Sequence, residues 1–171
     1  MSRIAMPVLA KSIQLIRGMT LEQKESLFDD MFQTQPTLLT ACLMQHRLGI
    51  PYEKMEFLIE LILICFQSMK GSGLKWPMIS EDDWERELAR LTGSINFTGG
   101  LDVALHRQSI QQYIDQHPEK MLFAFVMGEL TPWLPQCGLG ENNEKYVLLA
   151  ALTAVNCIAH VSMPHPKKKT K

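Results

Sequence analysis

The residues best suited to chemistry lie near the end of the chain, in a helix that the sequence predicts over residues 141–162. No Asp, Glu, Lys or Arg occurs over 146–166, so most of this helix is apolar. Four polar or ionisable side chains nevertheless share one of its faces, because they are spaced i, i+3, i+4 and i+7: Thr153, Asn156, Cys157 and His160. A polar stripe on a buried helix requires hydrogen-bond partners.

Two residues elsewhere in the chain are candidate partners for this stripe. Glu60 is a lone carboxylate between Ile59 and Leu61 in a second, very apolar predicted helix, and His106 falls on the apolar side of a predicted helix over 101–116. The functional hypothesis is a pocket for a ligand, lined by Glu60, His106, Asn156, Cys157 and His160. The alternative is a closed hydrogen-bond network that satisfies its own polar groups and binds nothing.

Metal and catalytic signatures are weak in this chain. Cys42 with His46, and Cys157 with His160, have helical spacing and could supply a Cys₂His₂ zinc site only if their two helices met at those turns. No Cys-x-x-Cys knuckle, Walker loop, Gly-x-Gly-x-x-Gly, Gly-x-Ser-x-Gly or His-Glu-x-x-His occurs. Cys137, in a loop rich in Pro and Gly, is the cysteine that we expect to be exposed. The sequence therefore favours a protein with no metal, no cofactor and no catalytic activity.

The elements that would position these residues are helices. Thr20 followed by Gln23 is a capping-box pattern, Pro36 and Pro51 fit the first turn of a helix, and Ser80 precedes three acidic residues. Strand patterns are nearly absent. We predict an all-α fold: a single compact helical bundle of about seven helices over 1–163, followed by a disordered basic tail over 164–171.

The order of elements also suggests an internal repeat. An amphipathic helix, a polar-Pro junction, an apolar helix, a loop with Glu-Lys and a very apolar helix occur in the same order over 20–70 and over 101–163. We interpret these as two copies of a three-helix unit, with the helix over 80–96 inserted between them. In that arrangement the helices that begin near Glu53 and Glu144 would be equivalent and would pack together.

The uncharged stretch at the end of the chain could be buried in protein or in lipid. Its length nearly suffices for a membrane span, and the lysines over 167–171 could anchor it. Thr153, Asn156 and His160 within it are unfavourable in lipid. The equivalent helix of the first repeat carries Glu56 and Glu60, which a protein core explains better. We therefore expect a core helix and regard membrane association as the less favoured alternative.

The remaining features point to interaction with proteins. The net charge is −1 and no helix has a basic face, which argues against nucleic-acid binding. Four widely spaced cysteines suggest reduced thiols and a cytoplasmic protein. Trp76 and Trp133 lie beside prolines in predicted loops and could anchor an interface. The leading hypothesis is a soluble, non-catalytic interaction protein that docks onto a protein partner or onto itself. A small-molecule or metal-binding bundle with a buried Glu/His pocket is the first alternative, and a membrane-anchored protein is the second.

Overall fold

The computed structural model describes residues 1–98 and 103–164, and within these ranges it does not describe the side chains of 96–98, 103–107 and 141. The described residues form eight α-helices and a short 3-10 turn, with no strand, which confirms the predicted all-α bundle with one helix more than expected. In chain order the elements are α1 (Met6–Gly18), α2 (Leu21–Thr34), α3 (Pro36–Arg47), α4 (Tyr52–Gly71), α5 (Glu81–Thr98), α6 (Val103–Gln116), α7 (Lys120–Trp133), η1 (Leu134–Gln136) and α8 (Glu141–His160).

The helices begin where local sequence signals place them. The Thr20 hydroxyl accepts from the Gln23 backbone N–H and the Gln23 side chain accepts from the Thr20 N–H, so α2 has a complete capping box. Pro36 is in the first turn of α3. Before α5, the Ser80 hydroxyl accepts from the Asp83 N–H at 3.1 Å while the Asp83 carboxylate accepts from the Ser80 N–H at 3.0 Å. Each reciprocal pair satisfies donors that a helix start leaves free.

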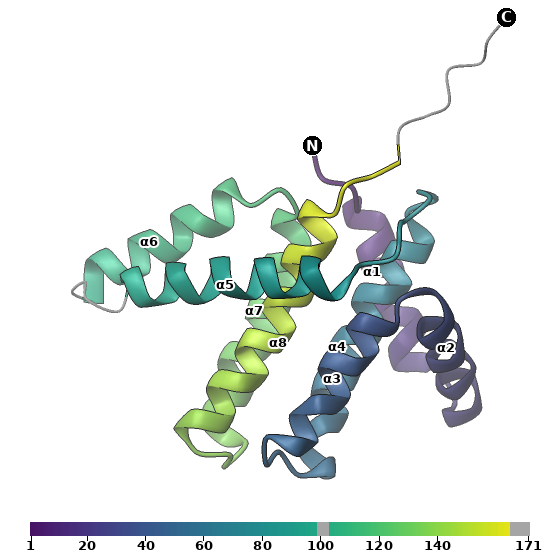
Figure 1. Cartoon of the computed structure of the whole chain (residues 1–171), viewed down its shortest axis with the longest axis horizontal. Helices are drawn as coiled ribbons and strands as arrows, with labels where there is room; N and C mark the ends of the chain where they lie inside the picture. Colours follow the sequence, from purple (N-terminus) through teal and green to yellow (C-terminus); the bar gives the residue numbers. More distant parts are fainter. Residues whose placement is uncertain (99–102, 165–171) are drawn as a thin grey trace, which may run out of the picture.

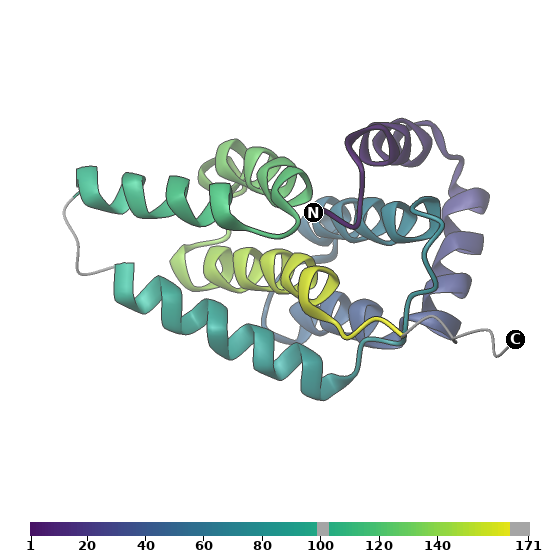
Figure 2. The same ribbon diagram turned by 90° about the horizontal axis from the view of Figure 1, so that it is seen from above.

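Two long helices, α4 and α8, pack against each other at the centre of the molecule. The helix α1 lies on α4 and α5 lies on α8, while α3 flanks α4 and α7 flanks α8 (Figures 1 and 2). The helices α2 and α6 are at the two outer ends. Because α8 contacts α3, α4, α5 and α7, its residues from Ala150 to Ala159 are all buried. In the part of the chain that the structure describes, no helix combines the length and the apolar character needed to cross a membrane.

The two halves of the chain place their helices in the same order. In the view of Figure 2, α1–α4 and α5–α8 lie side by side, and α5 has the position against α8 that α1 has against α4. The helices that begin near Glu53 and Glu144 pack together, as the repeat hypothesis requires. The duplication itself stays a hypothesis. The helix that was interpreted as an insert, α5, packs on α8 as α1 packs on α4.

Some local features differ from the sequence expectations. The helix α7 continues through Pro132 to Trp133, because a proline one residue from the helix end removes a single hydrogen bond from the last turn. Cys137 is only 5 % exposed, since the turn after η1 folds its thiol back onto the Leu134 carbonyl. The expected disordered tail lies, from residue 165 onward, outside the described residues.

Candidate functional site

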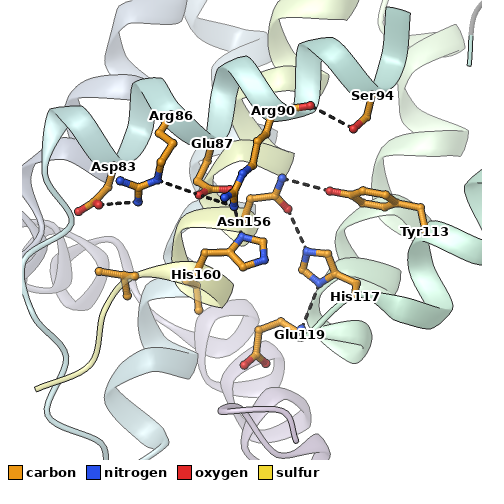
Figure 3. A network of polar contacts seen from close by, with 12 residues as sticks. Asp83, Arg86, Glu87, Arg90, Ser94, Tyr113, His117, Glu119, Asn156 and His160 are labelled. Atoms are coloured by element: carbon orange, nitrogen blue, oxygen red, sulfur yellow. Dashed lines mark hydrogen bonds and ion pairs between the residues drawn. The ribbon is translucent and has the colours of Figure 1, made fainter. Parts of the chain in front are cut away.

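A cluster of polar side chains lies where α5 crosses the end of α8 (Figure 3). Its central group is the carboxylate of Glu87, which has no exposed side-chain surface. One carboxylate oxygen accepts from His160 Nδ1 at 3.0 Å, and the other lies 3.2 Å from an Arg90 guanidinium nitrogen and 3.3 Å from Arg86 Nε. Three donors therefore compensate the burial of this one carboxylate, which would otherwise be costly.

A second chain of hydrogen bonds runs beside the first, and the direction of its protons can be assigned. The Glu119 backbone N–H donates to His117 Nδ1 at 3.1 Å, so this nitrogen carries a lone pair and the proton of a neutral ring must be on Nε2. His117 Nε2 then donates to Asn156 Oδ1 at 2.9 Å, which leaves the Asn156 amide nitrogen to donate to the Tyr113 hydroxyl oxygen at 3.3 Å. Burial, the main cause, lowers the pKa of His117 and supports its neutral form.

The N-terminal segment attaches to the same region through Glu119. This carboxylate is completely buried and accepts from the Ser2 hydroxyl, at 2.5 Å, and from the backbone N–H groups of Arg3 and Ile4. The Arg3 guanidinium reaches further and donates to the carbonyls of Ile158 and Val161 at the end of α8, both at 2.9 Å. A cation is favourable at a helix C-terminus, so Arg3 caps α8.

The polar groups at the centre of this cluster are hydrogen-bonded within the protein. Both ring nitrogens of His117 are engaged, and the carboxylate oxygens of Glu87 and Glu119 all have donors. Burial raises the pKa of the Cys157 thiol to about 12, with a further rise from the negative charges of Glu87 and Asp83, so this sulfur stays protonated and is a poor nucleophile. Within residues 1–98 and 103–164, no group of three His, Cys, Asp or Glu side chains gathers so as to hold a metal ion.

The structure separates the residues that the sequence suggested for one pocket. Asn156 and His160 both belong to the polar cluster, and Cys157 is buried beside it. Glu60 does not join them: it is one-third exposed and its Oε1 is paired with Arg17 Nε of α1 at 3.3 Å. His106 is in α6, and its side chain lies outside the part that the structure describes. Thr153 Oγ1, of the same predicted stripe, is buried and has no hydrogen-bond partner in the described part of the chain.

Sequence reasoning missed the acidic groups and one histidine of the cluster. Glu87 has an arginine one residue before it and another three residues after it, and so resembles a solvent-facing residue. It is nevertheless three residues after Trp84 and four before Leu91, which places it on the helix face that packs on α8. His117 and Glu119 flank Pro118 and resembled a polar junction between helices. A charge within an apolar stripe was the signal that could have identified Glu87.

The two tryptophans that were expected to serve as interface anchors fold onto the bundle. Trp76 Nε1 donates to the Met69 carbonyl at 2.9 Å, at the end of α4. The Trp133 ring stacks on Phe57, with a centroid distance of 4.2 Å and an interplanar angle of 8°. Both rings are partly buried against the core, and an interface role for them stays a prediction.

A groove of about 580 Å³ opens between α3, α5 and α8. One wall runs from Thr37 of α3 to Leu48, the residue that follows this helix, and the other is the face of α5 from Glu81 to Thr92. Each wall is therefore about three helical turns long. The first half of α8 contributes Tyr146, Leu149 and Ala150. Most of the lining surface is carbon, and the groove is therefore suited to an apolar surface of another molecule.

No protein-family model matches the chain, and no curated protein or solved structure matches it either.

Proposed function

We propose that this chain is a non-catalytic helical interaction protein that holds an amphipathic helix of a protein partner in the groove between α3, α5 and α8. The groove is the observation that carries the proposal. Its two helical walls, each about three turns long, provide a concave surface of the length that a short docked helix needs.

The apolar side chains at the groove support a protein partner. Met44 of α3, Leu48 just after α3 and Tyr146 of α8 line it, and they are 41 %, 44 % and 39 % exposed. Exposed apolar side chains that gather in one concavity mark interaction sites more often than isolated ones do. Methionine is flexible and polarisable, so Met44 can adapt to the side chains of a bound helix.

The charges at the groove specify the partner further. Among the described residues that line it, the charged ones are Glu81 and Glu85, one turn apart on α5, and no Lys or Arg joins them. A helix that docks here should therefore carry Lys or Arg on the flank that faces α5, with apolar residues at i, i+3, i+4 and i+7 on the buried face. Acidic helices would be rejected by the same two carboxylates.

The interior supports the absence of catalysis and the cellular location that we propose. In the part of the chain that the structure describes, the histidine and the cysteine of this region with a shifted pKa, His117 and Cys157, are both buried, and both ring nitrogens of His117 are already hydrogen-bonded. The four cysteines are unpaired and buried, which is consistent with a reducing compartment such as the cytoplasm.

Photo-crosslinking in the native host tests this proposal. We would replace Met44 with benzoylphenylalanine and use Phe32, 66 % exposed on α2 and outside the groove, as the matched control position. We expect a crosslink from position 44 to a basic amphipathic segment of one protein, and none from position 32. Equal crosslinking from both positions, or a crosslinked segment without such a helix, would overturn the proposal. A crosslink to a second copy of this chain would show that the groove serves self-association, and it would overturn the proposal of a separate partner protein.

A synthetic peptide of the crosslinked segment completes the test. Ala41→Trp places a large ring in the groove and should abolish peptide binding, whereas Gln33→Trp, on the exposed surface of α2, should leave the dissociation constant unchanged. The double substitution Glu81→Lys and Glu85→Lys should weaken binding of the basic peptide and favour one with acidic flanks. Binding that is indifferent to all three variants would place the interface elsewhere.

A further inference from the structure

A second cavity, of about 220 Å³, lies within the second half of the chain, where α5, α6, α7 and α8 converge. Its lining is mainly aliphatic and aromatic and includes Leu91, Ile110, Phe123, Met127 and Leu152. A cavity of roughly 150 Å³ with such a lining is enough to bind benzene. This cavity is therefore large enough for one aromatic ring with a short substituent, and too small for a peptide.

Tyr113 brings a hydroxyl group to the lining of this cavity. It lines the cavity and is also the last residue of the hydrogen-bond chain in Figure 3. The proton on each donor in that chain is fixed: from the Glu119 N–H to His117, from His117 to Asn156, and from Asn156 to the Tyr113 oxygen. Since the tyrosine oxygen already accepts, its own O–H is the donor at the end of the chain. Bonds that are donated in sequence also polarise one another, which strengthens this last donor.

We propose that this cavity binds a small, uncharged, ring-sized molecule whose carbonyl oxygen accepts a hydrogen bond from the Tyr113 hydroxyl. The ring occupies the apolar lining, and the carbonyl satisfies the hydroxyl proton. This site is separate from the proposed groove, because the two share no lining residue, and either proposal can fail without the other.

The absence of a basic lining residue determines the charge of the ligand. The described residues around the cavity include Ser94 and Ser109 but no Lys, Arg or His. A carboxylate placed there would lose its hydration without gaining a cation, which is costly, whereas a ketone, ester or amide loses little. The site therefore selects a neutral carbonyl compound over the corresponding acid.

The test uses the wild-type chain and two probes of similar size. Acetophenone has a ring and a carbonyl, and ethylbenzene has the ring alone. Carbon-13 labelling of the methionine methyl groups gives a signal from Met127 inside the cavity, with Met44 in the groove as the internal control. We expect both probes to shift the Met127 signal and leave Met44 in place, with acetophenone bound about threefold to tenfold more tightly because of one neutral hydrogen bond. Shifts at Met44 alone, or no shift at millimolar probe, overturn the proposal.

Two variants distinguish the contribution of the Tyr113 hydroxyl to probe binding from that of the cavity itself. Tyr113→Phe keeps the ring and should remove the preference for acetophenone while ethylbenzene still binds. Ile110→Trp fills the space and should abolish the response of Met127 to both probes. Both substitutions affect partly buried residues, and the helical circular dichroism of each variant shows whether it folds. An unchanged preference in folded Tyr113→Phe contradicts the assignment of the donor. The comparison of the two probes on the wild type stands even if neither variant folds.

Discussion

The crossings of α1 on α4 and of α5 on α8 have equivalent positions in the two halves of the molecule but opposite chemistry. In the first half the crossing is closely packed, since a Cβ on Gly71 would lie 3.1 Å from the Val8 side chain, and the charges lie outside it. There Arg17 bridges Glu60 and Glu129 at 3.3 and 2.9 Å. In the second half a carboxylate, Glu87, is inside the crossing.

The surfaces beside the two crossings also differ, because one is filled by side chains and the other is open. Next to α1 and α4, the stacked rings of Phe57 and Trp133 cover the contact with α7. Next to α5 and α8, the equivalent position beside α3 is the open groove, lined in part by short side chains such as Ala41 and Ala150. The same arrangement of helices thus gives a filled surface in one half and a hollow one in the other. Both proposed sites lie against α5 and α8, so the polar contacts of this crossing hold α5 on α8 without help from a filled surface.

The largest expected effect follows from removal of the buried carboxylate. Glu87→Ala leaves His160, Arg90 and Arg86 without their shared acceptor and creates a void between α5 and α8, so we expect a loss of about 3 kcal/mol in the free energy of unfolding. Ser12→Ala, in the equivalent crossing of the first half, removes one local bond to the Val8 carbonyl and should cost less than about 1 kcal/mol. Urea denaturation measures both. Equal costs would mean that the two crossings are held in the same way after all.

The second effect concerns the N-terminal segment, which joins the two halves. Glu119→Ala removes the acceptor of the Ser2 hydroxyl and of two backbone N–H groups. We expect a loss of about 2 kcal/mol, smaller than for Glu87, because the released segment can leave the protein and hydrogen-bond to water. Limited proteolysis should then cut near Arg3 at a higher rate. Glu119→Gln keeps one acceptor and serves as the control with an intermediate effect. A wild-type cleavage rate in Glu119→Ala would show that other contacts hold the segment.

The third effect is a pH dependence of stability that arises from His117, in the second half of the chain. The pKa of His117 is lowered in the folded protein, whereas in the unfolded chain it is about 6.5, so between these values the unfolded state binds the extra proton. The contribution of neutral His117 to the free energy of unfolding is therefore fully present above about pH 6.5. It is lost as the pH falls toward the folded-state pKa, by at most about 1.4 kcal/mol per pH unit.

The variant His117→Gln isolates this contribution, because the difference between its pH profile and that of the wild type is due to residue 117. Hydrogen exchange between pH 5 and 7 should show α8 losing protection before α4 does. Identical pH profiles of the variant and the wild type would contradict the neutral, donor-bound state that the contacts of His117 indicate.

The sequence predicted what is local and failed where partners are distant. The hydroxyls of Thr20 and Ser80 accept hydrogen bonds from backbone N–H groups three residues later, and Pro36 has no N–H to satisfy. Because these effects are local, the sequence alone predicts where the helices begin. The polar face of α8 was also predicted, and Asn156 and His160 do find polar partners. The partner of His160 is set by the crossing of α5 over α8, and those of Asn156 by the placement of α6 and of the turn before α7. Sequence periodicity contains no information on either arrangement.

Glu60 and Glu87 show why the candidate site was only partly predicted. Both are carboxylates within apolar helical stripes. Glu60 lies near the end of α1 and pairs with the exposed Arg17, whereas Glu87 lies between α5 and α8. Their local sequences favoured the opposite assignment, because Glu60 has apolar neighbours and Glu87 has arginines one residue before and three after it. Burial in this bundle is decided by which helix covers a face.

The smallest expected effect tests whether the ion pairs of Arg17 contribute to the packing of α1, α4 and α7. Arg17→Ala removes both ion pairs to Glu60 and Glu129, but Arg17 is 46 % exposed and each carboxylate about one-third, so water replaces most of what is lost. We expect a cost of about 0.5 kcal/mol, reduced further at 1 M salt. A loss above about 2 kcal/mol would mean that the bridge holds α1, α4 and α7 together. If the loss is small, the stack of Phe57 on Trp133 is what closes this surface, and Trp133→Ala should then create a hollow beside α7 that matches the groove beside α3.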